Sequence, residues 1–393
     1  MKIVWLAQYN VSTLQPELKL NRVVVQHSSS WIHSLSEILA LNKEVQLHII
    51  THSQLIDETQ VIKKNGICFH VIKYSFPFTK KGFPNYFPYD KLTGYHHFTK
   101  IARKIIDEIK PDIIHVHGTE GGYFNPTSKT NVPCIISIQG IISKYIKIEP
   151  TLAGFLQIPY ERRAIRNSRY FGCRTNFDYD FVRRINKNAV IFDLPEAMNI
   201  VFYKHQWKRP SKLSLLFVGS VNKRKGIEDL IHSLVKLKSI FPSILLKVIG
   251  SGMREYFDYL NEFIKKHDLN ENIVWLGSKL PGEVALELSQ SSFFVLPSLM
   301  DNSPNCLAEA MAVGVPSIAT RVGGIPSMVK DHIDGMLFDK HDVDGLVNII
   351  QRLANDTELQ NELSKNARAK AFERNYPPNV ADKYMEVYKS LIK

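Results

Sequence analysis

Short runs rich in β-branched and aromatic residues alternate along this sequence with segments long enough for helices. This alternation constrains the fold more than any other feature. The first series of predicted strands covers 2–8, 45–51, 67–74, 113–118, 133–140 and 169–175. The second covers 213–220, 243–250, 272–277, 292–298, 316–322 and 335–339. Strands separated by helices form βαβ units and parallel sheets, so we expect an α/β protein with two Rossmann-like, doubly wound halves.

The boundaries of the two halves follow from a break in the pattern. Residues 196–212 are polar, basic and aromatic, without a clean period. We therefore expect a first domain over 1–197, a linker over 198–212 and a second domain over 213–376. The last segment, 377–393, has one apolar stripe at helical spacing, so it must pack on its own domain or on the first one. Ser28 to Ser30 are expected to start another helix, whose apolar face includes Trp31 and Leu35.

Composition excludes some classes of protein. Hydrophobic residues make up 44% of the 393 residues and charged residues 22%, which excludes a disordered or collagen-like chain. The formal net charge of +12 favours anionic partners or simply reflects a solvated surface. We expect no nucleic-acid partner, because the sequence has no recognised motif and no clustered basic stripe.

The cysteines and the apolar runs of the sequence indicate the expected cellular compartment and the kind of membrane contact. The four cysteines lie far apart without a C-x-x-C motif, which argues against zinc and dithiol sites and is typical of the cytoplasm. The N-terminus lacks the apolar segment of a signal peptide, and no run of about 18 apolar residues occurs. We expect a cytoplasmic protein whose membrane contact, if it has one, is peripheral, on the inner face of the cytoplasmic membrane.

The stretch PSLMDNSPNCLAEAMAVGVP, residues 297–316, combines a strand end with a short helix. Ser303 as N-cap and Pro304 as first helical residue predict a helix over 304–313. Its first amides would lie beyond the carboxyl end of a parallel strand, where open α/β sheets bind ligands, and would suit a phosphate. From spacing alone, Asp301 and Glu309 either contact a ligand or are a cap residue and a solvated helix residue.

Three other stretches permit two interpretations each. Lys225, in a basic loop before a helix, can neutralise a diphosphate or lie in an exposed turn. Gly323 and Gly324 allow close approach of a ligand or form a tight loop. His115 and His117 share one strand face and either line a crevice or belong to the core. Without an H-E-x-x-H motif or a suitable acidic pair, no metal is expected, and a missing G-x-G-x-x-G argues against a dinucleotide dehydrogenase.

The run DNSPNCLAEAMAVGVPSIATRVGGIP resembles the E-x7-E signature of family-four glycosyltransferases with the GT-B fold. The resemblance is strong over 213–340. In the first half it rests on HSSSWIHSL, HVHGTE and SIQGIIS, which are similar to a bacterial surface-polysaccharide subgroup. It implies two Rossmann-like domains facing a cleft, with the C-terminal helix crossing back to the first domain.

The resemblance also implies an activity. The enzyme would be a retaining, metal-independent hexosyltransferase without a cofactor. It would move a sugar from a UDP- or GDP-sugar to a saccharide or lipid-linked saccharide in capsule, exopolysaccharide or lipopolysaccharide synthesis. An anionic bilayer that presents the acceptor is the expected surface partner. The alternatives are a non-hydrolysing sugar-nucleotide epimerase and a non-catalytic nucleotide-sugar-binding protein.

The resemblance implies three groups of site residues: those at the reacting centre, those that bind the donor and those that bind the acceptor. At the reacting centre, His117 lies beside the sugar, Lys225 neutralises the diphosphate and Asp301 contacts the donor sugar. Glu309 binds the ribose hydroxyls. The other implied donor-binding residues are Ser220, Gly277, Ser278, Lys279, Asn302, Ser303, Asn305, Cys306 and Leu307. The implied acceptor-binding residues are Gly118, Thr119, Glu120, Gln139, Gly140 and Glu196.

Three positions depart from the family pattern. Asp301 is one methylene shorter than the glutamate of the signature. Ser220 stands where a donor-phosphate arginine is common, so Lys225 or its neighbours Lys223 and Arg224 must supply the positive charge. Residues 195–199, PEAMN, replace the Pro-Asn-Gly-Val-Asp of many members.

Overall fold

The chain divides into two compact units in the computed structural model, which describes residues 1–21, 30–74 and 89–392. The first unit contains Met1–Ala197 and the C-terminal segment Pro377–Lys393, and the second contains Met198–Tyr376. Each unit is built on its own largely parallel sheet. Within the described ranges, no helix is both long and apolar enough to cross a membrane.

The sheet of the first unit contains eight strands among the described residues, in the order β3-β4-β2-β1-β5-β6-β7-β8. The strands are β1 (Lys2–Leu6), β2 (Gln46–Ser53), β3 (Gln60–Lys64), β4 (Ile67–Lys73), β5 (Ile113–His117), β6 (Cys134–Ser137), β7 (Tyr170–Cys173) and β8 (Val190–Asp193). All pairs are parallel except that of β3 with β4. The two edge strands, β3 and β8, were not predicted: β3 is a mixed, half-exposed sequence without an apolar run, and the apolar run of β8 is limited to Val190 to Phe192.

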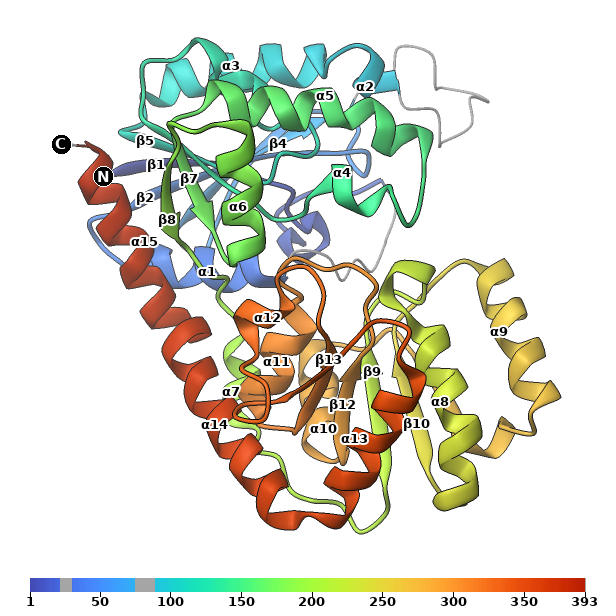
Figure 1. Cartoon of the computed structure of the whole chain (residues 1–393). Helices are drawn as coiled ribbons and strands as arrows, with labels where there is room; N and C mark the ends of the chain where they lie inside the picture. Colours follow the sequence, from blue (N-terminus) through green and yellow to red (C-terminus); the bar gives the residue numbers. More distant parts are fainter. Residues whose placement is uncertain (22–29, 75–88, 393) are drawn as a thin grey trace. The chain divides into compact units, whose positions relative to one another are not determined.

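Helices cover both faces of this sheet (Figure 1). On one face α3 (His96–Ile109), α5 (Leu152–Asn167) and α6 (Asn176–Ile185) bury apolar side chains against the strands. On the other face lie α1 (Ser30–Ala40) and α15 (Pro377–Ile392), which contact each other. Short helices cover Tyr89–Leu92 (α2) and Ile142–Tyr145 (α4). Ser28 and Ser29, expected before α1, lie outside the described residues.

The C-terminal helix α15 packs on the first sheet through tyrosines of its apolar stripe. The Tyr388 hydroxyl lies 3.0 Å from the indole nitrogen of Trp5 and 2.6 Å from Nδ1 of His115. Tyr384 and Tyr388 are almost fully buried. The last segment of the chain therefore completes the core of the first unit, although residues 198–376 intervene in the sequence.

The second unit, which is described in full, has six parallel strands in the order β11-β10-β9-β12-β13-β14. The strands are β9 (Ser214–Val218), β10 (Leu245–Ile249), β11 (Ile273–Gly277), β12 (Phe293–Leu296), β13 (Ser317–Thr320) and β14 (Met336–Phe338). The helices are α7 (Ile200–Lys204), α8 (Ile227–Ile240), α9 (Arg254–Lys266), α10 (Pro281–Ser289), α11 (Asn305–Val313), α12 (Ile325–Met328), α13 (Val343–Asn355) and α14 (Thr357–Asn375). All six strands correspond to predicted ones.

Residues 198–212, expected as a linker, instead belong to the second unit. Helix α7 packs on α10 and α11, and the Trp207 indole donates a hydrogen bond to the Ser291 carbonyl over 2.8 Å. The Phe202, Tyr203 and Trp207 side chains are buried there. The segment lacks a regular period because it binds with scattered aromatic residues rather than with one helical face.

Helix α11 differs from the prediction at its start. It begins at Asn305, with Pro304 as the N-cap residue and without a side-chain cap, so Ser303 does not have the predicted capping role. It ends as expected at Gly314, whose φ of 86° lies in the left-handed region that favours glycine.

Candidate functional site

Two loops meet at the carboxyl edge of the second sheet, because β9 and β12 are neighbours. The loop after β9 contains Gly226, which has a φ of 67°. A Cβ atom on Gly226 would lie 1.9 Å from the carbonyl oxygen of Pro297, in the loop after β12. The Leu299 amide also donates a hydrogen bond to the Arg224 carbonyl over 2.8 Å. Glycine is therefore required for the close approach of the two loops.

A buried ion pair joins these loops. The Lys225 ammonium lies 2.6 Å from Oδ2 of Asp301, and the Arg224 guanidinium lies 3.4 Å from Oδ1. The Ser298 hydroxyl donates to the same carboxylate over 3.0 Å. Burial alone would raise the pKa of Asp301, but the two cations and the hydroxyl outweigh it and lower the pKa below its ordinary value. Asp301 is therefore ionised, and it holds Lys225 at the mouth of α8.

The Gly323-Gly324 turn packs against the main-chain carbonyl of Asp301. A Cβ atom on Gly323 would lie 1.9 Å from the Asp301 carbonyl oxygen, and the Gly324 amide donates to that oxygen over 3.0 Å. Of the two interpretations of this pair, the structure supports the tight loop. The close approach that the glycines allow is to the protein backbone.

Helix α11 begins beside this ion pair. The Leu307 amide donates to the Pro304 carbonyl over 3.1 Å, so it is used within the helix and does not join the amides of Asn305 and Cys306 as an open donor. Burial raises the pKa of the Cys306 thiol to about 12. Lys225, Asp301 and Glu309 also act on that thiol electrostatically, which places all three around Cys306.

The remaining predicted donor residues occupy different surroundings. Asn302 and Leu307 are fully buried, whereas Ser303, Asn305 and Glu309 are partly exposed. Ser220 is exposed after β9. Gly277, Ser278 and Lys279 follow β11, which β10 separates from β9, and Lys279 lies 3.6 Å from the Glu283 carboxylate. The structure thus brings Lys225, Asp301, Cys306 and Glu309 together and leaves the 277–279 turn farther along the same edge.

In the first unit, unpaired polar atoms gather just after β5. Both ring nitrogens of His117, Oγ1 of Thr119 and Oε2 of Glu120 are buried without a hydrogen-bond partner in the described part of the chain. Burial lowers the pKa of His117 well below its usual range and raises the pKa of Glu120. Buried polar groups are almost always paired in folded proteins. Four such atoms in four consecutive residues indicate a place for a ligand.

The neighbouring His115 has a different environment. Its Nδ1 lies 2.6 Å from the Tyr388 hydroxyl and its Nε2 lies 2.8 Å from the Ser137 hydroxyl. The His117 ring stacks on His115 with centroids 4.0 Å apart and packs edge-on against Trp5 at 4.4 Å. His115 is thus a satisfied core residue, and only His117 has unused hydrogen-bonding capacity.

Glycines and a second ion pair surround Glu120. A Cβ atom on Gly118 would lie 2.3 Å from Oε2 of Glu120, and one on Gly140 would lie 3.4 Å from Oε1. The buried Arg174 guanidinium pairs with Glu196 and donates to the Gln139 carbonyl. Burial raises the pKa of Glu196 to about 7, although Arg174 opposes this shift. Arg174 could not be identified from the sequence, because an arginine after a short strand carries no motif.

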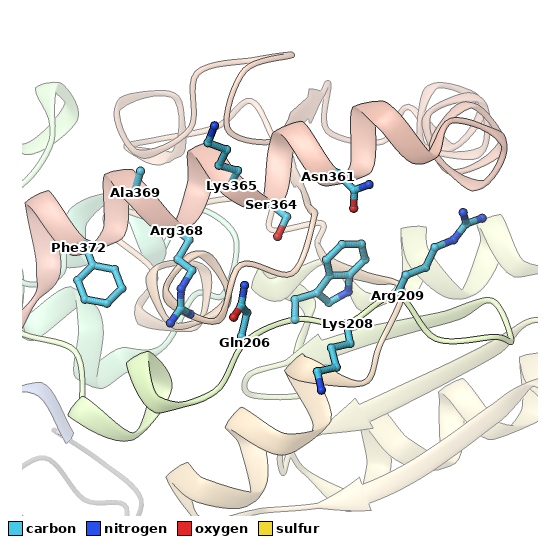
Figure 2. Close-up of a pocket in the computed structure, with 10 residues that line it drawn as sticks. Gln206, Lys208, Arg209, Asn361, Ser364, Lys365, Arg368, Ala369 and Phe372 are labelled. Carbon is cyan, nitrogen blue, oxygen red and sulfur yellow. The ribbon is translucent and has the colours of Figure 1, made fainter.

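A separate cavity of about 630 Å³ lies in the second unit between α14 and the segment that follows α7 (Figure 2). None of the predicted site residues lines it. Arg368 donates to the carbonyls of Tyr203, His205 and Ala312 over 2.6–2.8 Å, so it fastens α14 to that segment. Lys208, Arg209 and Lys365 also line the cavity, and no acidic side chain does so among the described residues.

Two family models match the chain. "Glycosyl transferases group 1" matches residues 202–370 and "Glycosyl transferase 4-like" matches residues 22–175. An uncharacterized glycosyltransferase of Methanocaldococcus jannaschii is 27% identical over 331 residues, covering 83% of this chain and 85% of that protein. The Escherichia coli UDP-Gal:alpha-D-GlcNAc-diphosphoundecaprenol alpha-1,3-galactosyltransferase is 30% identical over 34% of this chain and 33% of its own length. Several other relatives match over less than half of their length.

Solved structures share the fold. Sucrose-phosphate synthase from Thermosynechococcus elongatus superposes with a TM-score of 0.82 at 17% identity, covering 99% of this chain and 98% of that one. Anabaena HepE in complex with UDP gives a TM-score of 0.74 at 15% identity, with full coverage of both chains. At these identities the likeness is one of fold.

Proposed function

We propose that this chain transfers a sugar from a nucleotide-diphosphate sugar to a saccharide or lipid-linked saccharide. The chain belongs to the family-four glycosyltransferases with the GT-B fold. The observation that carries the proposal is the buried Lys225–Asp301 pair next to the first turn of α11. Because Arg224 also lies at this carboxylate, the two cations leave a net positive charge beside the first amides of α11, which suits a diphosphate leaving group.

The chemistry follows from where charge develops. In the transition state, positive charge grows on the anomeric carbon and negative charge on the departing diphosphate. Lys225 and the amides of Asn305 and Cys306 would stabilise that negative charge electrostatically, while Glu309 accepts hydrogen bonds from the ribose hydroxyls. Because these groups supply the positive charge, we propose a metal-independent reaction.

For the stereochemistry, we propose retention through attack on the face that the diphosphate leaves. One oxygen of the departing diphosphate would take the acceptor proton, so that no strong general acid or base is required. Asp301 would keep Lys225 ionised and in place until the donor binds, and would then be near the donor sugar.

The acceptor is assigned to the first unit. Hydroxyl groups of the acceptor sugar would satisfy the unpaired atoms of Thr119 and Glu120, while the unpaired nitrogens of His117 would face the transferred sugar at the reacting centre. Gln139 and Glu196 belong to the same edge of the sheet and would complete the subsite. The E. coli relative is named for a UDP-sugar donor and a diphosphoundecaprenol-linked acceptor, and HepE was solved with UDP. We therefore favour UDP over GDP and a lipid-linked acceptor in surface-polysaccharide synthesis.

The basic cavity in Figure 2 offers a contact for an anionic bilayer that carries such an acceptor. Lys208 and Lys365 are exposed at its edge. Cosedimentation with vesicles that contain anionic lipid should exceed that with zwitterionic vesicles, and Lys208→Glu with Lys365→Glu should remove the difference. Equal binding to both vesicle types would contradict peripheral attachment through this surface.

A nucleotide-release assay across UDP- and GDP-sugars, followed by an acceptor screen with the best donor, tests the function. We expect release of nucleoside diphosphate to rise when the correct acceptor is added. Conversion of the donor into an epimer without acceptor would instead show the epimerase. Binding without any product would show a nucleotide-sugar-binding protein.

A further inference from the structure

Two histidines and one cysteine of the first unit meet on the sheet face that packs against α3. In the parallel register of β2 and β4, His48 lies opposite Cys68, and Ile50 lies opposite His70. Side chains of paired residues, and of residues two apart on one strand, project from the same face. His48, Cys68 and His70 therefore form one cluster. It lies toward the amino ends of these strands, away from the carboxyl ends where residues 117–120 lie.

Two of the three distances in this cluster match those of a metal centre. Nδ1 of His48 lies 3.1 Å from Nε2 of His70, and Sγ of Cys68 lies 3.6 Å from that same nitrogen. All three potential ligand atoms lie within 4.8 Å of one another. In a tetrahedral zinc site, bond lengths of about 2.0 Å to nitrogen and 2.3 Å to sulfur place two nitrogens about 3.3 Å apart and a nitrogen and a sulfur about 3.6 Å apart.

The rings also have a suitable orientation. The centroids of His48 and His70 are 5.4 Å apart and their planes differ by 25°, so the rings meet edge to edge through their nitrogens. Without a metal, one proton between the two nitrogens explains this contact. Each ring would have to rotate by about 35° to direct its lone pair at a shared tetrahedral ion.

We propose that His48, Cys68 and His70 bind one divalent cation of the zinc class, with water as the fourth ligand. His48 and Cys68 are partly exposed, which gives the ion and the water access, while His70 is 9% exposed and fixed by the sheet. Binding breaks the S–H bond of Cys68 and releases its proton to solvent. The imidazole that donates the shared hydrogen bond breaks that N–H bond and takes up a proton on its other ring nitrogen, so that one metal–sulfur and two metal–nitrogen bonds can form. The proposed site is independent of the proposed glycosyl transfer.

The charges around the cluster narrow the choice of ion. Lys2 and Lys63 are close enough to act electrostatically on His48, and Lys63 also acts on Cys68. Two nearby ammonium groups disfavour hard cations such as magnesium, which would gain nothing from neutral imidazoles. Burial raises the pKa of the Cys68 thiol and Lys63 only partly opposes that shift, so the bound ion itself must displace the thiol proton. Thiolate with imidazole selects zinc-class ions.

The absence of a C-x-x-C motif, which argues against a zinc site built on neighbouring cysteines, does not exclude a site of this kind. Its ligands come from two neighbouring strands, and only the register of β2 with β4 brings them together. In the sequence the one local sign is the C-x-H triplet at 68–70.

Cobalt(II) titration of the full-length, chelator-treated protein tests the proposal. We expect one cobalt per chain, a thiolate-to-cobalt absorption in the near ultraviolet, intense visible bands of tetrahedral cobalt, and displacement by zinc. Cys68→Ser should abolish the near-ultraviolet band. His70→Ala should weaken binding by more than the roughly 10- to 100-fold that loss of an outer-shell partner costs. Cys134→Ser, a cysteine on β6 of the same sheet, is the matched control and should bind normally.

His48→Ala provides a second ligand variant at a partly exposed position, in case the buried His70→Ala does not fold. Circular dichroism establishes that each variant is folded. The proposal is overturned if folded wild-type protein binds no cobalt at one per chain. It is also overturned if Cys68→Ser retains the thiolate band. Either outcome would mean that His48 and His70 form only an imidazole–imidazole hydrogen bond and bind no metal. Neither outcome would affect the proposal of glycosyl transfer.

Discussion

The ammonium of Lys225 lies 2.6 Å from the carboxylate of Asp301, and both side chains are buried where two loops of the second unit meet. The family signature places a glutamate at the position of Asp301. Here Gly323 and Gly324 hold the main-chain carbonyl of Asp301, and the shorter side chain reaches Lys225 directly. Asp301 thereby fixes the cation that the proposed reaction needs, before any ligand binds.

Lys225→Ala should lower kcat/KM for sugar transfer by at least about tenfold, a loss of about 1.4 kcal/mol of transition-state stabilisation. The cation beside the leaving diphosphate would be lost, and the neighbouring Arg224 is already engaged with Met300 and Asp301. Steady-state kinetics with the best donor measure the effect. Lys223→Ala, in the same loop but exposed, is the control and should retain activity. Equal rates for both folded variants would remove Lys225 from the mechanism.

Glu309→Gln should also lower transfer by about tenfold or more, because an amide accepts weaker hydrogen bonds from ribose hydroxyls than a carboxylate does. The loss should be seen chiefly in the donor KM, since these contacts are made in the ground state as well as in the transition state. Glu362→Gln, on the exposed side of α14, serves as the control. An unchanged donor KM would contradict the assignment.

Much of the fold could be predicted from the sequence, because buried parallel strands are continuous apolar runs. The edge strands β3 and β8 could not: β3 is a half-exposed segment with two lysines that resembles many others, and β8 is only four residues long. In the candidate site, the positions of Lys225, Asp301 and Glu309 followed from strand ends and helix starts. Their pairing could not be predicted in this way. Spacing along the sequence does not show whether Asp301 contacts Lys225, because the two residues lie in loops that follow different strands. The Arg174–Glu196 pair depends on the same kind of long-range contact.

Tyr388→Phe should lower the free energy of unfolding by about 1–3 kcal/mol, because the buried partners Trp5 and His115 each lose a hydrogen bond. Chemical denaturation monitored by circular dichroism measures this. Tyr179→Phe, at an exposed tyrosine of α6 whose hydroxyl accepts only a long, exposed hydrogen bond from Arg183, should change stability by less than about 0.5 kcal/mol. Similar stability of the two variants would mean that α15 contributes little to the first unit through Tyr388.

Glu196 gives a pH dependence with a defined sign. Burial raises its pKa from 4.5 to about 7, so the folded state holds this proton more tightly than the unfolded chain. The stabilising contribution of protonated Glu196 is complete below pH 4.5 and is lost as the pH rises through about 7. Relative to Glu196→Gln, the wild-type protein should therefore lose unfolding free energy between about pH 4.5 and 7. Denaturation curves at several pH values test this, and a constant difference between the two proteins would contradict it.

Gly226 and Gly277 form a matched pair, because their φ values are 67° and 66°. A Cβ atom at Gly277 would meet nothing within 4 Å, whereas one at Gly226 would overlap the Pro297 carbonyl at 1.9 Å. Gly277→Ala should therefore cost only the left-handed backbone conformation, about 1 kcal/mol. Gly226→Ala should cost more than that, and it should also lower transfer, because separating the loops moves Lys225 away from Asp301. Denaturation midpoints and kinetics of both variants decide the matter: equal stabilities would show that the contact of the two loops is not required.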